Sequence, residues 1–115
     1  MSVKKATLSE TAVKEILGGP IRIFFNKDTV GTDTLVFVMG DFGPGQGLEP
    51  HVHDKQEEVY FCISGTGTVW HGTDRKETPI EPGVALWIPR GVEHFVRNTG
   101  NEQLTIAFFL APGSS

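Results

Sequence analysis

Residues 45–65 read GQGLEPHVHDKQEEVYFCISG, and residues 83–98 read GVALWIPRGVEHFVRN. The first stretch contains two histidines separated by one residue, His51 and His53, followed by the acidic residue Glu58. Successive side chains of a β-strand point to opposite faces, so an i, i+2 pair directs both imidazoles to one side of a sheet. This pattern predicts a strand that presents two histidines to a common site.

The positions of Glu58 and His94 indicate that the chain turns between them and the histidine pair. Glu58 lies five residues after His53, the wrong parity for one uninterrupted strand, so the polar residues 54–56 are expected to form a turn or bulge. Glu58 would then return on a neighbouring strand. His94 follows a turn signature that contains Pro89 and begins a second short strand, residues 94–96.

These four side chains could bind one metal ion. Three neutral imidazoles and a carboxylate suit a borderline divalent transition metal, whereas calcium and magnesium sites are built from oxygen ligands. The candidate ions are manganese, iron, cobalt, nickel, copper and zinc, and the residue types do not choose among them.

Both stretches resemble the paired signatures of the cupin superfamily. The first signature is Gly, five residues, His-x-His, four residues, Glu, six residues, Gly; the second is Gly, five residues, Pro-x-Gly, two residues, His, three residues, Asn. Every fixed position is filled. The resemblance implies an all-β fold, a small antiparallel jelly-roll β-barrel, with four metal ligands inside it: His51, His53, Glu58 and His94. Glu57 misses the spacing by one residue and is expected to face away from the metal.

The chain of 115 residues is expected to be one domain, residues 1–115. Its apolar runs are short and rich in β-branched and aromatic residues, which favours strands. The one predicted helix is near the N-terminus. There, residues 7–10 resemble a capping box, apolar residues at helical spacing continue to Leu17, and the sequence GGP at 18–20 ends the helix.

The other apolar runs predict strands over residues 21–25, 35–42, 59–63, 68–70, 84–88 and 104–110. The polar residues 26–33 are expected to join the first two as a hairpin loop. Several of these runs are apolar on both faces, so the outside of the barrel should be covered by a second sheet or by another subunit. Since single-barrel cupins commonly pair, the resemblance also implies a homodimer.

Charge and hydropathy exclude several classes of partner. The formal net charge is −4 and no cluster of Lys and Arg is present, which argues against nucleic acid or an anionic membrane as the partner. The N-terminus lacks the apolar core of a signal peptide, and no run approaches the roughly 18 apolar residues of a membrane span. We therefore expect a cytoplasmic protein that binds a small molecule.

Tyr60 is the first candidate for a catalytic group, because it shares strand parity with Glu58 and its ring should line the cavity near the metal. His71 and Glu49 are weaker candidates, since one precedes a turn and the other lies on a loop. Cys62 is the single cysteine. It shares the same parity and is expected to be a small buried residue.

A metal in a small apolar cavity supports three functions, all of them known among cupins. With iron or copper the protein would be a dioxygenase. With zinc, nickel or manganese it would use the ion as a Lewis acid, as an isomerase, lyase, cyclase or decarboxylase. The third possibility is a binding module without turnover. The sequence favours an enzyme, and a dioxygenase first, because the inferred wall carries Tyr60 and apolar residues but few acids or bases.

Overall fold

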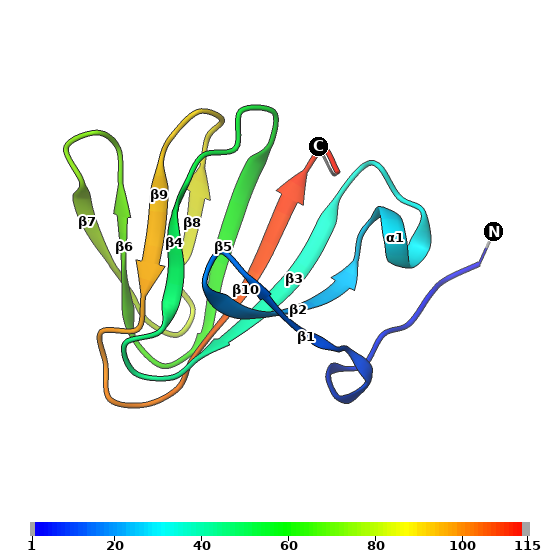
Figure 1. Ribbon diagram of the computed structural model, residues 1–115, viewed down its shortest axis with the longest axis horizontal. Helices are drawn as coiled ribbons and strands as arrows, with labels where there is room; N and C mark the ends of the chain where they lie inside the picture. Colours follow the sequence, from blue (N-terminus) through cyan, green and yellow to red (C-terminus); the bar gives the residue numbers. More distant parts are fainter. Residues whose placement is uncertain (1, 114–115) are drawn as a thin grey trace.

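The computed structural model describes residues 2–113, and over this range the chain forms ten strands and two short helices (Figure 1). In chain order the elements are the 3-10 helix η1 (Leu8–Glu10), β1 (Val13–Ile16), β2 (Gly19–Phe25), the helix α1 (Lys27–Val30), β3 (Val36–Phe42), β4 (Gly47–His51), β5 (Glu57–Ser64), β6 (Gly67–His71), β7 (Lys76–Ile80), β8 (Ala85–Ile88), β9 (His94–Arg97) and β10 (Leu104–Ala111). Neither of these helices is long and apolar enough to cross a membrane.

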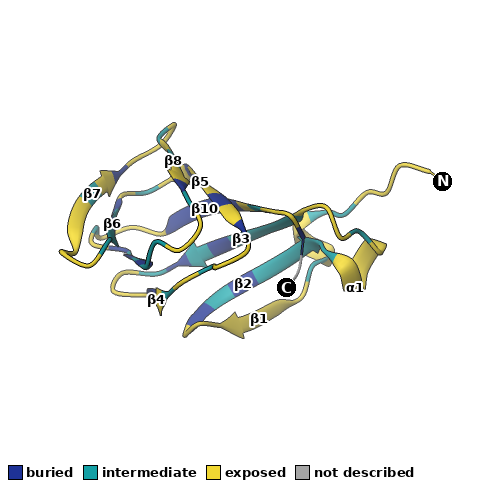
Figure 2. Ribbon diagram, turned by 90° about the horizontal axis from the view of Figure 1, so that it is seen from above, coloured by how far each residue is buried: buried dark blue, intermediate teal, exposed yellow. Residues whose placement is uncertain are grey.

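The strands form two antiparallel sheets that face each other. One has six strands in the order β1-β2-β3-β10-β5-β8, and the other has four in the order β4-β9-β6-β7. From β3 onward the chain crosses repeatedly between the two sheets, which is jelly-roll topology. Exposed residues gather on β1, β7 and α1 at the margins (Figure 2). The predicted all-β jelly-roll is confirmed.

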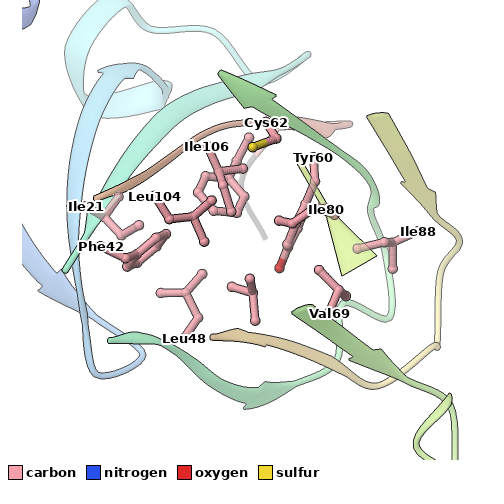
Figure 3. Close-up of a cluster of buried hydrophobic side chains, with 12 residues drawn as sticks. Ile21, Phe42, Leu48, Tyr60, Cys62, Val69, Ile80, Ile88, Leu104 and Ile106 are labelled. Atoms are coloured by element: carbon pink, nitrogen blue, oxygen red, sulfur yellow. The ribbon is translucent and has the colours of Figure 1, made fainter. Parts of the chain in front are cut away.

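The core lies between the sheets and is filled by the inward-facing residues of both (Figure 3). Strand β5 shows the alternation most clearly: Tyr60 and Cys62 are each 1% exposed, while Val59 and Phe61 between them are 36% and 40% exposed. Cys62 is a small buried core residue, as expected, and its Sγ lies 3.6 Å from the carbonyl oxygen of Ser64. The strand period therefore decides which residues of β5 reach the interior.

The N-terminal prediction is correct only at its start. The expected helix is reduced to the three residues of η1, and Val13–Ile16 form strand β1, which pairs with β2. Leu17 and Gly18 both have positive φ, 52° and 81°, the backbone of a two-residue hairpin turn. A helix of about ten residues is marginal in water. Pairing with β2 stabilises the extended form instead.

The other predicted elements are confirmed with shifts of one or two residues at their ends. Residues 26–33 join β2 to β3, as predicted, and they include the single turn α1, whose N-cap is Asn26. Strand β7 was not predicted, because its sequence KETPI is largely polar. Its pairing with β6, rather than its own pattern, makes it a strand.

The fixed glycines and asparagine of the two signatures have backbone roles. All four glycines have φ between 78° and 88°, a region that favours glycine. Asn98 is 2% exposed, and its Nδ2 donates to the carbonyl oxygens of Phe42 at 2.8 Å and Glu102 at 2.7 Å. Because Phe42 ends β3 and Asn98 follows β9, this amide ties the two sheets together at one end of the barrel.

Candidate metal centre

Four side chains from both sheets converge inside the barrel. His51, His53, Glu58 and His94 each offer one ligand atom, and these atoms all lie within 4.8 Å of one another. His51 at the end of β4 is paired directly with His94 at the start of β9. His53 follows β4 in the segment that leads to a bend at residues 54–55. The four residues named from the sequence are therefore brought together.

Glu58 reaches the cluster from the opposite sheet. We expected it on a strand next to the histidine pair, and this detail is wrong: β4 pairs with β9, whereas β5 pairs with β10 and β8. The bend after His53 carries the chain across the barrel rather than back along the same sheet. The cluster consequently connects the two sheets.

The carboxylate of Glu58 lies among the imidazoles. Its Oε1 is 3.0 Å from Nε2 of His94 and 3.3 Å from Nε2 of His53. The ring centroid of His51 is 4.2 Å from that of His94 and 5.0 Å from that of His53. The Nε2 atoms and the carboxylate are thus directed to one small volume.

Backbone carbonyl groups orient two of the rings. Nδ1 of His51 is 2.7 Å from the carbonyl oxygen of Glu49, and Nδ1 of His94 is 2.9 Å from that of Val92. When Nδ1–H donates to a carbonyl, the lone pair of Nε2 is left for a metal, an arrangement common among metal-bound histidines. The donor set and its orientation fit a divalent transition metal.

Burial and mutual contacts set the charges of the cluster. Burial lowers the pKa of His51 below 6.5, against the opposing effect of its hydrogen bond to Glu49. Burial alone would raise the pKa of Glu58, but contacts with His53 and His94 outweigh it and hold this pKa below 4.5. At neutral pH His51 is therefore neutral and Glu58 is ionised, and these are the forms that bind metals.

A cavity of about 240 Å³ opens beside the cluster. His51, His53, Glu58 and Asn26 are its polar lining residues, and the remaining wall is apolar, made of Ile16, Leu17, Ile21, Ile23, Val36, Val38, Leu48, Phe108 and Leu110. No lysine or arginine is among these described lining residues. The sequence did not predict Ile16 and Leu17 as cavity residues, because their spacing also fits a helix. The pairing of β1 with β2 places them in the cavity wall.

Tyr60 lies next to the cluster without lining this cavity. Its ring centroid is 5.8 Å from that of His94 and 4.6 Å from that of Phe108. Its oxygen points across the barrel toward the four-stranded sheet (Figure 3). The hydroxyl is buried with no hydrogen-bond partner among the described residues. Burial, with the charge of Glu58, raises the pKa of Tyr60 well above 10.

The weaker candidates lie apart from the cavity. His71 is opposite His94 in the sheet, but its Nε2 is 2.8 Å from Oγ1 of Thr78, and it lines a separate pocket of about 220 Å³. Glu49 is exposed and contributes only its backbone carbonyl to the site. Glu57 is also exposed and accepts a hydrogen bond from Nε1 of Trp87 on the outer surface, as expected of a residue that faces away from the metal.

Two facing antiparallel sheets around a cluster of three histidines and one glutamate define a barrel domain with a candidate metal site. A family model described as "Cupin domain" matches residues 38–110, which is more than half of the chain. The chain therefore belongs to the cupin family.

Curated relatives with several different names are similar to this chain. Protein SchB of Streptomyces halstedii is 30% identical over 95 residues, which are 83% of this chain and 67% of SchB. Dimethylsulfoniopropionate lyase DddW of Ruegeria pomeroyi is 34% identical over 93 residues, 81% of this chain and 59% of the lyase. An oxalate-binding protein of Thermotoga maritima is 25% identical over 108 residues, 90% of this chain and 88% of that protein. The chain thus spans about two thirds of the length of SchB and less than two thirds of the length of DddW.

Solved structures share the fold. A predicted oxalate decarboxylase from Thermotoga maritima has a TM-score of 0.80 at 22% identity, over 95% of this chain and 99% of that one. An uncharacterized protein with a double-stranded beta-helix domain from Klebsiella pneumoniae has a TM-score of 0.79 at 24% identity, over 98% of this chain and 93% of that one. At these identities the likeness concerns the fold alone.

Proposed function

We propose that this chain is a metal-dependent enzyme acting on a small, largely apolar organic molecule that carries an oxygen donor. The observation that supports it is the cavity of about 240 Å³, whose polar groups are confined to the cluster and Asn26. An apolar wall with a few convergent polar groups is typical of small-molecule sites. A small dicarboxylate would carry two negative charges into an apolar cavity, which is costly unless a cationic side chain pairs with them. No such side chain is among the described lining residues.

The cluster would hold one divalent transition metal through the three imidazoles and the carboxylate of Glu58. Such an ion supplies Lewis-acid polarisation of a substrate oxygen and, if it is iron or copper, chemistry with O₂. The chain's own residues keep the site in order. The carbonyl groups of Glu49 and Val92 orient two ligand rings, and the apolar wall excludes water from the bound molecule.

Within this class we propose a dioxygenase first, because the described wall offers no free base beyond the cluster. Proton abstraction needs a group whose pKa is near the working pH. Tyr60 is protonated at neutral pH, and His71 lies with Thr78 at another pocket. Since Tyr60 does not line the cavity, we now propose it as a residue that positions the cluster rather than as a catalytic group in contact with substrate: its ring lies beside His94, and its buried hydroxyl has no described protein partner.

The alternatives rest on relatives. DddW is named a lyase, which supports a reaction that uses the metal only as a Lewis acid. The oxalate-binding protein supports ligand binding without turnover. Two further relatives, CurC of Streptomyces cyaneus and TcmJ of Streptomyces glaucescens, are named polyketide synthase proteins, at 28% and 25% identity.

The test begins with the metal content of protein purified without a tag or chelator. The protein is then loaded separately with iron, copper, zinc, nickel and manganese, and O₂ consumption is followed with a panel of phenols, diketones and thiols. We expect uptake with iron or copper and one compound class, and none in His94→Ala. A loaded protein that consumes no O₂ but converts a compound with zinc, nickel or manganese would instead be a non-redox enzyme.

A further inference from the structure

A bulge in β4 turns His51 into the barrel. The register of β4 against β9 shifts between Leu48 and His51. Glu49 and Pro50 together lie opposite a single residue of β9, which is the pattern of a β-bulge. Leu48 and His51 both line the cavity although they are three positions apart, which the alternation of a regular strand does not allow. The bulge therefore gives His51 the facing that brings it to the cluster.

The backbone of Glu49 bonds away from β9 at this bulge. The next residue, Pro50, has no N–H to donate. The N–H of Glu49 donates to the carbonyl oxygen of Leu17 at 2.8 Å, and the carbonyl oxygen of Glu49 is 2.7 Å from Nδ1 of His51. One residue, Glu49, therefore joins Leu17 to a candidate metal ligand.

Leu17 belongs to the turn of the β1–β2 hairpin, which forms one wall of the cavity. The turn lies beside β4 (Figure 1), and Ile16 and Leu17 line the cavity next to the cluster. The contact with β4 is close, since a Cβ built on Gly18 would lie 3.0 Å from Oε1 of Glu49. The turn therefore rests on Glu49 and covers part of the cavity at the same time.

The backbone of Leu17 is strained. Its φ is 52°, and a turn of this kind prefers asparagine or glycine at that position. Strain of this sort is often retained at functional sites, where the surrounding structure holds it. A leucine at this position supplies an apolar side chain to the cavity wall, and its carbonyl oxygen accepts from Glu49.

The hairpin is held firmly at one end only. Strand β1 is exposed at all four positions and lies at the edge of its sheet, and elements with few buried contacts open most easily. Just before β1, Nη1 of Arg22 donates to the carbonyl oxygens of Thr11 at 2.6 Å and Leu8 at 3.2 Å. Opening of the hairpin would therefore be largest at its turn, where the bond between Leu17 and Glu49 must break.

We propose that the turn of the β1–β2 hairpin is a movable wall of the cavity, and that its seating on Glu49 positions the ring of His51. The inference rests on the proposed metal site. With the turn seated, the carbonyl of Glu49 is fixed and holds Nδ1–H of His51, so that Nε2 stays available to the metal. Coupling between two sites is reciprocal, so a bound metal should also hold the turn closed over the molecule in the cavity.

Two glycine variants with similar backbone strain test this coupling. Gly18 and Gly31 have φ of 81° and 76°, where a β-branched residue is strained. Gly18→Val disturbs the seated turn, whereas the side chain of Gly31→Val enters open space at the end of α1. We expect the zinc dissociation constant, measured by calorimetry, to rise about 10-fold in Gly18→Val and to stay at the wild-type value in Gly31→Val. Equal constants for the two folded variants overturn the proposal.

Glu49→Pro covers the case in which Gly18→Val does not fold. It removes the N–H donor and keeps the carbonyl, and the preceding Leu48 is already extended in β4, as a proline requires. Circular dichroism checks the fold of each variant. The absorption spectrum of the cobalt-loaded protein should change in Glu49→Pro, because the ligand geometry changes, and should not change in Gly31→Val. A wild-type spectrum in folded Glu49→Pro would mean that the bond to Leu17 serves stability only.

The wild type offers a direct measurement of the same bond. Amide exchange at Glu49, followed by NMR, should slow about 10-fold when zinc binds, while exchange at Gly31, which bonds to Lys27, should not change. In the metal-free protein, the nitrogen spectrum of the His51 ring should show the proton on Nδ1, and Gly18→Val should show both tautomers. A wild type that binds no zinc refutes the proposed function, and the ring spectrum then decides this inference: an unchanged ring in Gly18→Val overturns it.

Discussion

At the scale of single residues, two of the candidate ligand histidines are oriented by backbone oxygens. The carbonyls of Glu49 and Val92 are two residues before His51 and His94, respectively, and each accepts from Nδ1 of its histidine. On β9 this orientation leaves Nε2 of His94 3.0 Å from Oε1 of Glu58, and on β4 it leaves Nε2 of His51 available to a metal. The hydrogen bond that orients each ring is therefore formed within its own stretch, and no distant side chain takes part in it.

The adjacent carboxylates give the sharpest residue-scale test. Glu58 is buried against two imidazoles, whereas Glu57 is exposed on the outer surface. We expect Glu58→Gln to lower metal affinity about 10- to 100-fold or more, because it removes the anionic ligand. Glu57→Gln should bind the metal with the same affinity as the wild type. Titration calorimetry with zinc measures both, and equal affinities for the two variants would contradict the proposed ligand set.

The protonation of His51 predicts how the metal-free protein responds to acid. Its folded-state pKa is below 6.5, so the unfolded chain takes up a proton at this position before the folded protein does. This contribution to stability is present above pH 6.5 and is lost as pH falls toward the folded-state pKa. We would measure urea unfolding in the presence of a chelator. From pH 7 to about pH 5, the free energy of unfolding of His51→Gln should fall less than that of the wild type. Parallel curves for the two proteins would contradict this assignment.

At the scale of elements, close packing of β4 against β9 brings His51 beside His94. A Cβ built on Gly47 would lie 1.9 Å from the carbonyl oxygen of Val96 on β9. No side chain fits this gap without moving one strand from the other. The close pairing of β4 and β9 thus depends on Gly47, a glycine that the paired signatures do not include.

Two nearby glycines, Gly45 in the turn before β4 and Gly47 at the start of β4, give a matched test of that packing. Gly47→Ala should cost about 3 kcal/mol or more of unfolding free energy, because the methyl group meets backbone that cannot yield. Gly45→Ala faces open space and strains only its φ of 82°, a cost of about 1–2 kcal/mol. Urea unfolding measures both, and the reverse order would show that β4 and β9 are less tightly paired.

At the scale of the whole molecule, the cluster joins two sheets that otherwise meet mainly through apolar contacts. His51 and His94 belong to the four-stranded sheet and Glu58 to the six-stranded sheet. An ion bound by all three would hold the sheets together in the folded state only. Binding to the folded state alone raises stability by mass action.

Metal addition should therefore stabilise the fold. At a free zinc concentration 100 times the dissociation constant, the unfolding free energy should rise by about 2.7 kcal/mol, which corresponds to roughly 10 °C in Tm. His94→Ala should lose most of this gain while keeping a cooperative transition, because the apolar core remains. Scanning calorimetry with and without zinc measures the effect. An equal gain in the variant would place the ion elsewhere.

Much of this architecture is predictable from sequence because its signals are local. Alternation identified β5 and its inward residues, and the fixed spacings identified the four residues that cluster inside the barrel. The failures concern segments whose own pattern is weak or ambiguous. Val13–Ile16 fit a helix until they paired with β2, and polar Lys76–Ile80 became a strand only beside β6.

The sequence by itself determined the cupin fold, the identity of the four clustered residues and the turns between them, because these depend on residue type and short spacing. Only the tertiary structure decided that Glu58 faces the histidines from the other sheet and that Ile16 and Leu17 wall the cavity. These features depend on which strands become neighbours. Strand pairing is set by contacts between distant parts of the chain, and no local pattern encodes it.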